Sequence, residues 1–398
     1  MRFVPPADSM LRALLSRACR ATLTPCLAVL AALGILISAG RAAEITIVSP
    51  QPWQVIQRND ASAANGRAFG PGGSAVVRVV LAGEDTFSMG AAWEARVGVA
   101  MMPASEPVPT LPWRSLTLVR SMDAAKQPGT IVADVVVPAG GWYRLEVRER
   151  GRDGAIRREA SVEPFGVGEV FLVAGQSYAT NTNDERLRVT DARQRVAAYD
   201  VATRTWRLAD DPQPAPDRSE HGSIWPPVGD ALARALDVPI GFANVAVGGT
   251  SSAQWMPEGP LSARLWQAGR DLGRFRAVLW QQGESDVLAD TPTAEYVGRL
   301  ERIRAAAVEA WGSAPPWICA LSTHHPTVYR KPEGEESVRI AITELCRRPG
   351  FVLGPDTDQL QGENRGGPQS RRHFSAIGQR NAARLWSEVL LRQLRAGR

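Results

Sequence analysis

The spacing of hydrophobic and polar positions divides the chain into two regions. Between residues 44 and 165, short runs of β-branched residues or of alternating polarity are separated by Gly, Pro and Asp. These runs are EITIVSP, SAVVRVVLAG, EARVGVAMM, SLTLV, TIVADVVVP and WYRLEVRER. Short strands at regular intervals predict a small β-sandwich. No group of catalytic residues stands out there, so we expect a structural or substrate-contacting role for this region.

The pattern changes after Glu163-Pro-Phe-Gly. Continuously apolar runs now alternate with segments of helical periodicity, and the apolar runs are GEVFLVAG, VPIGFANVAV, AVLWQQG, PPWICALST and GFVLG. Strands of this buried character, separated by helices, predict a parallel sheet covered by helices on both faces. The stretch 205–226 carries four Pro and several charges, which favours a surface loop or lid.

The first 43 residues have the pattern of a secretory signal. Four Arg residues precede the apolar run Cys26 to Ala39, and small residues follow at 40–43. A basic segment, a short apolar segment and a small-residue cleavage zone are typical of such signals, and we expect cleavage after Ala42 or Ala43. The run is short for a membrane span, although an uncleaved anchor is the alternative. The predicted organisation is a signal at 1–43, a sandwich at 44–165 and a second domain at 166–398, with export to the periplasm or beyond and no stable membrane insertion after cleavage.

Signal removal changes the charge of the chain. The full sequence has a net charge of +5, but residues 1–42 hold five Arg and one Asp, which leaves the mature chain near +1. Nucleic-acid binding needs a basic face that survives processing, so we expect no nucleic-acid partner.

Cysteine and histidine use argues against a metal site. Cys319 and Cys346 remain after signal removal, and they form either one disulfide or two buried thiols. The four His residues lack Cys or carboxylate partners at metal-ligand spacing. We therefore expect neither a metal nor an organic cofactor.

Polar residues follow each predicted strand of the second region. In open α/β sheets ligands bind at the carboxyl ends of the strands, so these residues should meet at one edge. The edge would carry one serine, glycines, amides, carboxylates and histidines, which together predict a catalytic site. The segments are Gln176-Ser177, Gly248-Gly249-Thr250, Gln282-Gly283-Glu284-Ser285-Asp286, Thr323-His324-His325, Asp356-Thr357-Asp358 and His373-Phe374-Ser375.

Four of these segments closely resemble a known family. AGQS (174–177), NVAVGGTS (244–251), VLWQQGESD (278–286) and HFSAIGQ (373–379) are similar to the SGNH hydrolase superfamily. Within it they resemble the sialate O-acetylesterase-like group and the carbohydrate esterases related to acetylxylan esterases. The resemblance covers roughly residues 165–396 and implies a flavodoxin-like three-layer α/β/α fold, here preceded by the small β-sandwich. It also implies ester hydrolysis.

The resemblance assigns roles to individual residues. Ser177 would be the nucleophile and His373 its base, because an unassisted hydroxyl is a poor nucleophile. The oxyanion of the tetrahedral intermediate would be bound by the Ser177 N–H, the Gly249 N–H (Gly248 is the second choice) and the Gln282 side chain. We expect Gln176, Thr250 and Trp255 to contact the substrate. Trp255 could stack on a sugar ring, although a core role is equally open.

Two positions depart from the family pattern. Tyr178 follows the nucleophile where Asn is usual, and Ser370 stands where the family has Asp three residues before the histidine. Loss of that acid in a Ser-His-Asp enzyme can cost about four orders of magnitude in rate. We expect Glu284 to replace it, with Asp358 or Asp356 as the next choices. A backbone carbonyl that orients His373 is a further alternative.

The sequence as a whole predicts an exported serine esterase that removes O-acetyl groups from carbohydrates, its only expected partner being the acetylated carbohydrate. The acetyl and carbohydrate preferences come from the resemblance alone. Three alternatives remain: a degenerate hydrolase that binds glycans without cleaving them, an acyl transferase that uses the same serine, and an adhesive protein whose activity lies in residues 44–165.

Overall fold

The computed structural model describes six segments of the chain: residues 45–59, 73–83, 91–100, 112–120, 130–366 and 372–396. The predicted signal segment and Ser370 lie outside these residues. Residues 42–398 form one compact unit. Among the described residues, no helix is both long enough and apolar enough to cross a lipid bilayer.

The described residues between 45 and 165 form β-strands and the turns that join them, and each predicted run contains strand residues. Alternate positions of β3 and β4 are buried in one hydrophobic core, as the period-2 pattern predicts for a sandwich. One antiparallel sheet has the order β1-β3-β7-β6 (Ile45–Ser49, Ser74–Gly83, Thr130–Pro138, Val119–Arg120). Antiparallel pairing in the order β5-β4-β8-β9 joins Arg114–Ser115, Ala92–Val99, Gly140–Arg150 and the first part of Ile156–Gly175.

Strand β9 (Ile156–Gly175) is shared between the two predicted regions. Its first part pairs antiparallel with β8, and the last part, from Glu169 to Gly175, pairs in parallel with the neighbouring strands β12 and β13. The short strand β2 (Val55–Gln57) pairs with β9 at Gly166–Gly168. The strand therefore runs through Glu163-Pro-Phe-Gly without a break. The domain boundary at residue 165 stays a prediction.

The central sheet confirms the predicted fold class. Its strand order is β11-β10-β12-β9-β13-β14-β15, and every neighbouring pair is parallel except β10 with β11. Without the edge pair β10–β11, the order in chain numbering is 2-1-3-4-5, which is flavodoxin-like. The other strands are β10 (Val196–Asp200), β11 (Thr205–Leu208), β12 (Ile240–Asn244), β13 (Ala277–Gln281), β14 (Trp317–Leu321) and β15 (Phe351–Asp356).

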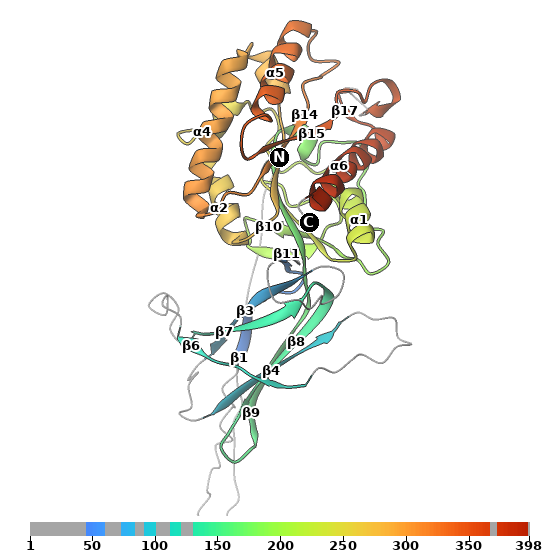
Figure 1. The fold of residues 1–398 in the computed structure, drawn as a ribbon. Helices are drawn as coiled ribbons and strands as arrows, with labels where there is room; N and C mark the ends of the chain where they lie inside the picture. Colours follow the sequence, from blue (N-terminus) through green and yellow to red (C-terminus); the bar gives the residue numbers. More distant parts are fainter. Residues whose placement is uncertain are drawn as a thin grey trace, which may run out of the picture. The chain divides into compact units, whose positions relative to one another are not determined.

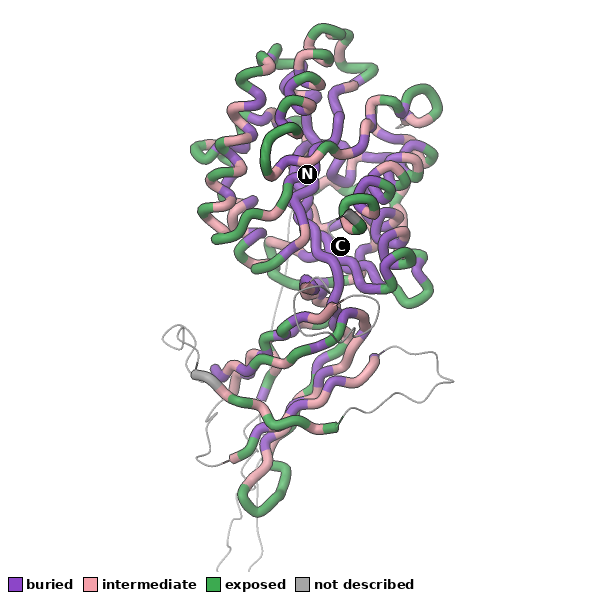
Figure 2. Tube along the Cα trace, in the orientation of Figure 1, coloured by how far each residue is buried: buried purple, intermediate pink, exposed green. Residues whose placement is uncertain are grey.

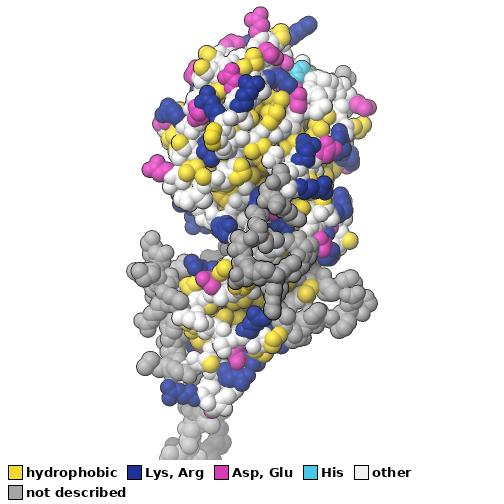
Figure 3. Space-filling model, viewed as in Figure 1, with side chains coloured by type: hydrophobic (Ala, Val, Ile, Leu, Met, Phe, Trp, Pro, Cys, Tyr) yellow, Lys and Arg dark blue, Asp and Glu magenta, His cyan; other side chains and the backbone are white. Residues whose placement is uncertain are grey.

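Helices cover both faces of this sheet (Figure 1). On one face α1 (Trp225–Leu236) packs against α6 (Ala376–Ala396), and on the other α4 (Thr293–Trp311) packs against α2 (Ser262–Leu272) and α5 (Pro332–Leu345). Each face has its own hydrophobic core. In Figure 2 the strands of the sheet are coloured mainly as buried, whereas the helices around them carry exposed residues. On the face drawn in Figure 3, basic and acidic side chains are interspersed rather than gathered by sign.

The stretch 205–226 is not a free surface loop throughout. Residues 205–208 form the edge strand β11, and α1 begins at Trp225. Hydrogen bonds from the buried Asn181 hold the segment between β11 and α1 in place. Its Nδ2 donates to the carbonyls of Gln213 (2.8 Å) and Ser219 (3.0 Å). The sequence missed β11 because a four-residue amphipathic strand beside a Pro-rich segment has no distinct pattern.

Candidate active site

Ser177 lies at the carboxyl end of β9, in the middle of the parallel sheet. Strands β12 and β13, which both come later in the chain than β9, lie on its two sides. The serine therefore occupies the point where the strand order reverses. Ligands bind at this point in open α/β sheets. Gly175 ends β9 at φ +129°, and a Cβ there would lie 2.1 Å from the Gln281 carbonyl oxygen. Only glycine therefore lets β9 approach β13 this closely before the chain turns into the helical turn Ser177–Ala179.

Two backbone N–H groups beside the serine are available to a ligand. The Ser177 N–H and the Gly249 N–H donate to no other residue among those the structure describes. The Gly248 N–H, in contrast, donates to Asp217 Oδ2 at 3.0 Å. Gly248 borders the nucleophile, because a Cβ built on it would lie 3.8 Å from Ser177 Cβ. The geometry therefore favours Gly249 over Gly248 as an oxyanion donor.

The amide of Gln282 is engaged in a buried network. Its Nε2 faces three acceptors: Asp286 Oδ2 at 2.6 Å, Gln176 Oε1 at 3.2 Å and the Thr250 carbonyl at 3.2 Å. An amide NH₂ has two hydrogens, so all of its donor capacity is already taken up. Gln176 accepts through Oε1 from Gln282 and from the Ser285 N–H (3.1 Å), and its own NH₂ has no partner in the described part of the chain.

Two residues predicted to contact substrate, Trp255 and Thr250, are buried and hydrogen-bonded within the protein. Trp255 is completely buried, packs edge-on against Trp280 with centroids 5.6 Å apart, and donates from Nε1 to Thr250 Oγ1 at 3.1 Å. The Thr250 hydroxyl in turn donates to the Val247 carbonyl at 2.8 Å. Neither side chain is free to meet a sugar, and the core alternative for Trp255 is the one observed.

His373 reaches the site on the short strand β17 (His373–Phe374), directly before α6. This strand pairs with β16 (Arg365–Gly366). The segment after Ser177 also holds β17 in place. The Phe374 N–H donates to Asn183 Oδ1 at 3.2 Å, and the Asp184 N–H donates to the Phe374 carbonyl at 3.1 Å. Residues nearly 200 positions apart in the sequence are thus tied together by backbone contacts.

The imidazole of His373 is enclosed by other rings. Its centroid lies 5.2 Å from that of Tyr178 and 5.5 Å from that of His325. Burial, with the nearby His325, Arg372 and Arg365 charges, lowers the pKa of His373 to about 3. The ring is therefore a neutral base at ordinary pH. Its Nε2 has no hydrogen-bond partner, and no hydrogen bond joins the ring to Ser177 or to a carboxylate among the described residues.

Glu284 is a buried carboxyl group with one free oxygen. It is the first residue of α3 (Glu284–Leu288), and its Oε1 accepts from Ser322 Oγ at 2.5 Å. Its Oε2 has no partner within the described segments. Burial raises the pKa of Glu284 to about 8, assisted by the charge of Asp358. Such a shift is typical of functional carboxyl groups.

Asp358, the other carboxylate considered for the triad, has no free oxygen. Its Oδ1 accepts from the N–H groups of Thr323 (2.8 Å) and His324 (2.9 Å). Its Oδ2 accepts from Thr323 Oγ1 and from the guanidinium of Arg339, both at 2.7 Å. Asp356 pairs with the same arginine. These contacts give both aspartates a structural role in shaping the loop after β14.

Two residues at the site were not identified as functional from the sequence. Tyr178 was noted only as a departure from the family pattern, and His325 only as a polar residue at a strand end. Both lie against the His373 ring. Their positions follow from the backbone path after β9 and β14, for which the sequence offers no signal.

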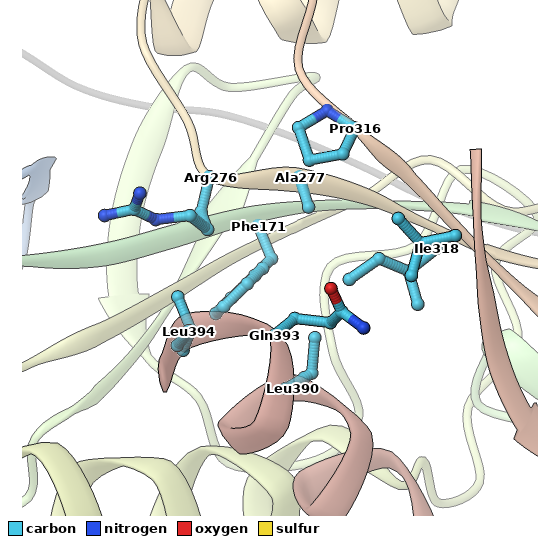
Figure 4. A pocket seen from close by; sticks show the side chains of 9 residues that line it. Phe171, Arg276, Ala277, Pro316, Ile318, Leu390, Gln393 and Leu394 are labelled. Atoms are coloured by element: carbon cyan, nitrogen blue, oxygen red, sulfur yellow. The ribbon is translucent and has the colours of Figure 1, made fainter. Parts of the chain in front are cut away.

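A mainly apolar cavity lies away from these residues. It has a volume of about 220 Å³ and is lined by the first residue of β13, by Pro316 before β14 and by the last turns of α6 (Figure 4). These are the amino ends of the strands, opposite the edge that carries Ser177. No cluster of His, Cys, Asp or Glu among the described residues is arranged to hold a metal ion, and Cys319 and Cys346 are free thiols.

The strand order, with the serine at its switch point, is that of the flavodoxin-like fold expected from the SGNH resemblance. Residues 167–332 match the family described as carbohydrate esterase, sialic acid-specific acetylesterase. The match confirms the resemblance to the sialate O-acetylesterase-like group for this part of the chain, and it supports an O-acetyl esterase activity. It includes Ser177, Gly249 and Glu284 and ends before His373.

Three solved structures are similar to this chain at low sequence identity. A carbohydrate acetylesterase from Xanthomonas citri is 16% identical, with a TM-score of 0.51, over 85% of this chain and 72% of that one. A carbohydrate acetylesterase from Sinorhizobium meliloti is 9% identical, with a TM-score of 0.38, over 56% of this chain and 99% of that one. An esterase from Pseudoalteromonas sp. is 13% identical, with a TM-score of 0.37, over 57% and 99%. No curated protein matches the chain.

Proposed function

We propose that the chain is an exported serine esterase that removes O-acetyl groups from carbohydrates through an acyl-serine on Ser177. One observation carries the proposal. Two N–H groups have no partner among the described residues: that of the serine at the switch point of the sheet, and that of Gly249, the residue after Gly248, which borders Ser177. Donors placed in this way are what the oxyanion of acyl transfer requires. The family match supplies the acetyl and carbohydrate preferences.

The reaction assigns each group a step. Ser177 Oγ attacks the acetyl carbonyl carbon while His373 accepts the hydroxyl proton, and the carbonyl oxygen becomes an oxyanion bound by the two N–H groups. Collapse of the intermediate breaks the ester bond, and the imidazolium returns its proton to the departing sugar oxygen. Water then attacks the acyl-serine with His373 again as base, which releases acetate and restores Ser177.

Glu284 is the proposed orienting acid for His373. Its Oε2 and the Nε2 of His373 are both buried without partners among the described residues. Because the pKa of Glu284 lies near 8, the carboxyl group is protonated in the free protein at neutral pH. It becomes anionic, and therefore able to stabilise an imidazolium, as the pH rises through that value.

The direct test is acetate release from 4-nitrophenyl acetate by the purified protein. We expect turnover in the wild type and a loss of about a thousandfold or more in kcat for both Ser177→Ala and His373→Ala. Asp358→Asn provides a control, because its structural contacts should affect folding more than chemistry. Equal rates for the wild type and Ser177→Ala would overturn the proposal. A panel of acetylated glycans would then identify the substrate.

A glycan-binding protein without turnover is the second candidate. The observation in its favour is that His373 has no hydrogen bond to Ser177 or to a carboxylate among the described residues. It predicts saturable binding of an acetylated glycan by a folded protein that releases no acetate from any member of the panel. Acetate release that depends on Ser177 would exclude it.

A further inference from the structure

Tyr178 directly follows the nucleophile, where the family resemblance expects Asn, and its side chain is 1% exposed. The guanidinium of Arg365 donates to its hydroxyl oxygen. The carbonyl oxygens of Arg372 and His324 lie on the other side of the hydroxyl, the latter at 3.1 Å. A guanidinium can only donate, so the hydroxyl accepts from Arg365 and turns its own hydrogen toward one of these carbonyls or toward His325 Nδ1, which lies at 3.4 Å.

The same side chain contacts His373 and both of its neighbours in the chain. Its ring meets the imidazole edge-on, with centroids 5.2 Å apart, and its hydroxyl binds the carbonyl of Arg372, the residue immediately before the histidine. The ring also packs against Phe374, the residue after the histidine, at 4.7 Å. Tyr178 therefore restrains both the backbone and the ring of His373 from a position adjacent to Ser177.

Arg365 holds the Tyr178 side chain in place. It is 8% exposed, donates to the carbonyls of Leu360 and Thr357, and lies 4.9 Å from the Tyr178 ring and 5.0 Å from the Phe374 ring. No acidic side chain pairs with it among the described residues. A buried cation held by carbonyls, a hydroxyl and two aromatic faces fixes those groups in place. Since Arg365 belongs to β16, which pairs with β17, it joins the tyrosine to the strand that carries the histidine.

We propose that Tyr178, held by Arg365, is a positioning residue that fixes His373 relative to Ser177. The pair supplies part of the restraint that an acid at position 370 supplies in the family pattern. The inference rests on the proposed function, because it takes His373 to be the base for Ser177.

The test is Tyr178→Phe, which keeps the ring and removes the hydroxyl. We expect kcat for 4-nitrophenyl acetate to fall by about tenfold or more with little change in KM, because a misplaced base slows the chemical step without altering binding. Tyr329→Phe is the matched control. The Tyr329 hydroxyl also donates to a backbone carbonyl, that of Thr323, and its ring lies near His325, but no contact joins it to His373.

A second readout does not depend on turnover. The ¹H–¹⁵N resonances of the His373 ring are expected to shift in Tyr178→Phe and to stay in place in Tyr329→Phe. Arg365→Lys, which keeps the charge but loses the guanidinium fork, should produce the same shift, and it replaces Tyr178→Phe if that variant does not fold. A wild-type kcat together with unmoved His373 resonances, in either Tyr178→Phe or Arg365→Lys, would overturn the inference. An inactive wild type would overturn the proposed function, whereas the resonances would still decide whether Tyr178 holds His373.

Discussion

Glu284 and His373 are two buried groups whose pKa values shift in opposite directions for the same physical reason. Burial disfavours the charged form of each, so the carboxyl group keeps its proton and the imidazole stays neutral. Both have an atom without a partner among the described residues. The site is therefore uncharged at these two positions near neutral pH, and charge would develop there only during the reaction.

The raised pKa of Glu284 predicts how stability depends on pH. The unfolded chain releases this proton near pH 4.5, whereas the folded chain holds it to about pH 8. The folded state thus binds the extra proton between these values, and the free energy of unfolding from this group falls as the pH rises across the window. We expect Glu284→Gln to lose this component, so that urea denaturation shows the variant gaining stability relative to the wild type between pH 5 and pH 9.

Parallel stability curves for the two proteins would contradict this account of Glu284. The rate profile offers an independent check. If anionic Glu284 orients His373, kcat/KM of the wild type should rise through about pH 8, and this rise should be absent in Glu284→Gln. The lowered pKa of His373 predicts that the profile has no separate inflection near pH 6.5, the ordinary pKa of histidine.

At the scale of elements, the approach of β9 to β13 depends on Gly175. A Cβ at this position would collide with the Gln281 carbonyl, and the residue also has φ +129°. We expect Gly175→Ala to lower the free energy of unfolding by about 3 kcal/mol or more and to abolish activity, since Ser177 follows two residues later. Gly273→Ala is the control: Gly273 has φ +66° but open space around it, so only about 1 kcal/mol should be lost. Equal losses in thermal or urea unfolding would show that the collision is unimportant.

The sequence predicted some elements well and others not at all, for identifiable reasons. The last part of β9 and the strands β12, β13 and β14 are continuous apolar runs, because a parallel sheet covered on both faces buries every residue. Strands β10 and β11 are short and flank polar turns, so their pattern is indistinct. The continuity of β9 through Pro164 was also missed, since proline usually marks the end of a strand.

At the site, the order of the segments along the chain predicts which residues follow strand ends, but it does not predict how their hydrogen bonds are shared. Ser177, Gly249 and His373 follow strand ends and could be placed at one edge. The engagement of Gln282 by three acceptors, and of Asp358 by four donors, depends on side-chain geometry that no periodicity encodes. Trp255 is ambiguous in the sequence because an aromatic residue after a strand serves a core or a ligand equally well.

At the scale of the whole molecule, a buried ionic cluster joins β-rich and α/β segments. Glu169 in β9 is completely buried and accepts from Arg58, beside β2, and from Arg276, beside β13, both at 2.7 Å. Removing one partner of a buried cluster leaves unpaired charge, which typically costs about 3–5 kcal/mol. We expect Glu169→Gln to destabilise residues 42–398 by an amount of this order in urea denaturation, with a single transition for the compact unit.

Asp134→Asn is the matched control for that prediction. Asp134 pairs with Arg78 through side chains that are 46% and 68% exposed, so its loss should cost less than about 1 kcal/mol. Two separate transitions in Glu169→Gln, with the first confined to the β-rich segments, would instead show that the cluster couples two units that unfold independently.

The central claim is that Ser177 carries the acyl group during turnover. The most direct measurement is mass spectrometry of the peptide containing Ser177 after rapid acid quench of the protein mixed with 4-nitrophenyl acetate. The account predicts one added acetyl group on Ser177 in the wild type, far less in His373→Ala at the same quench time because acylation has lost its base, and none at this position in Ser177→Ala. Turnover by the wild type without acetylation of Ser177, or with the acetyl group on another residue, would contradict it.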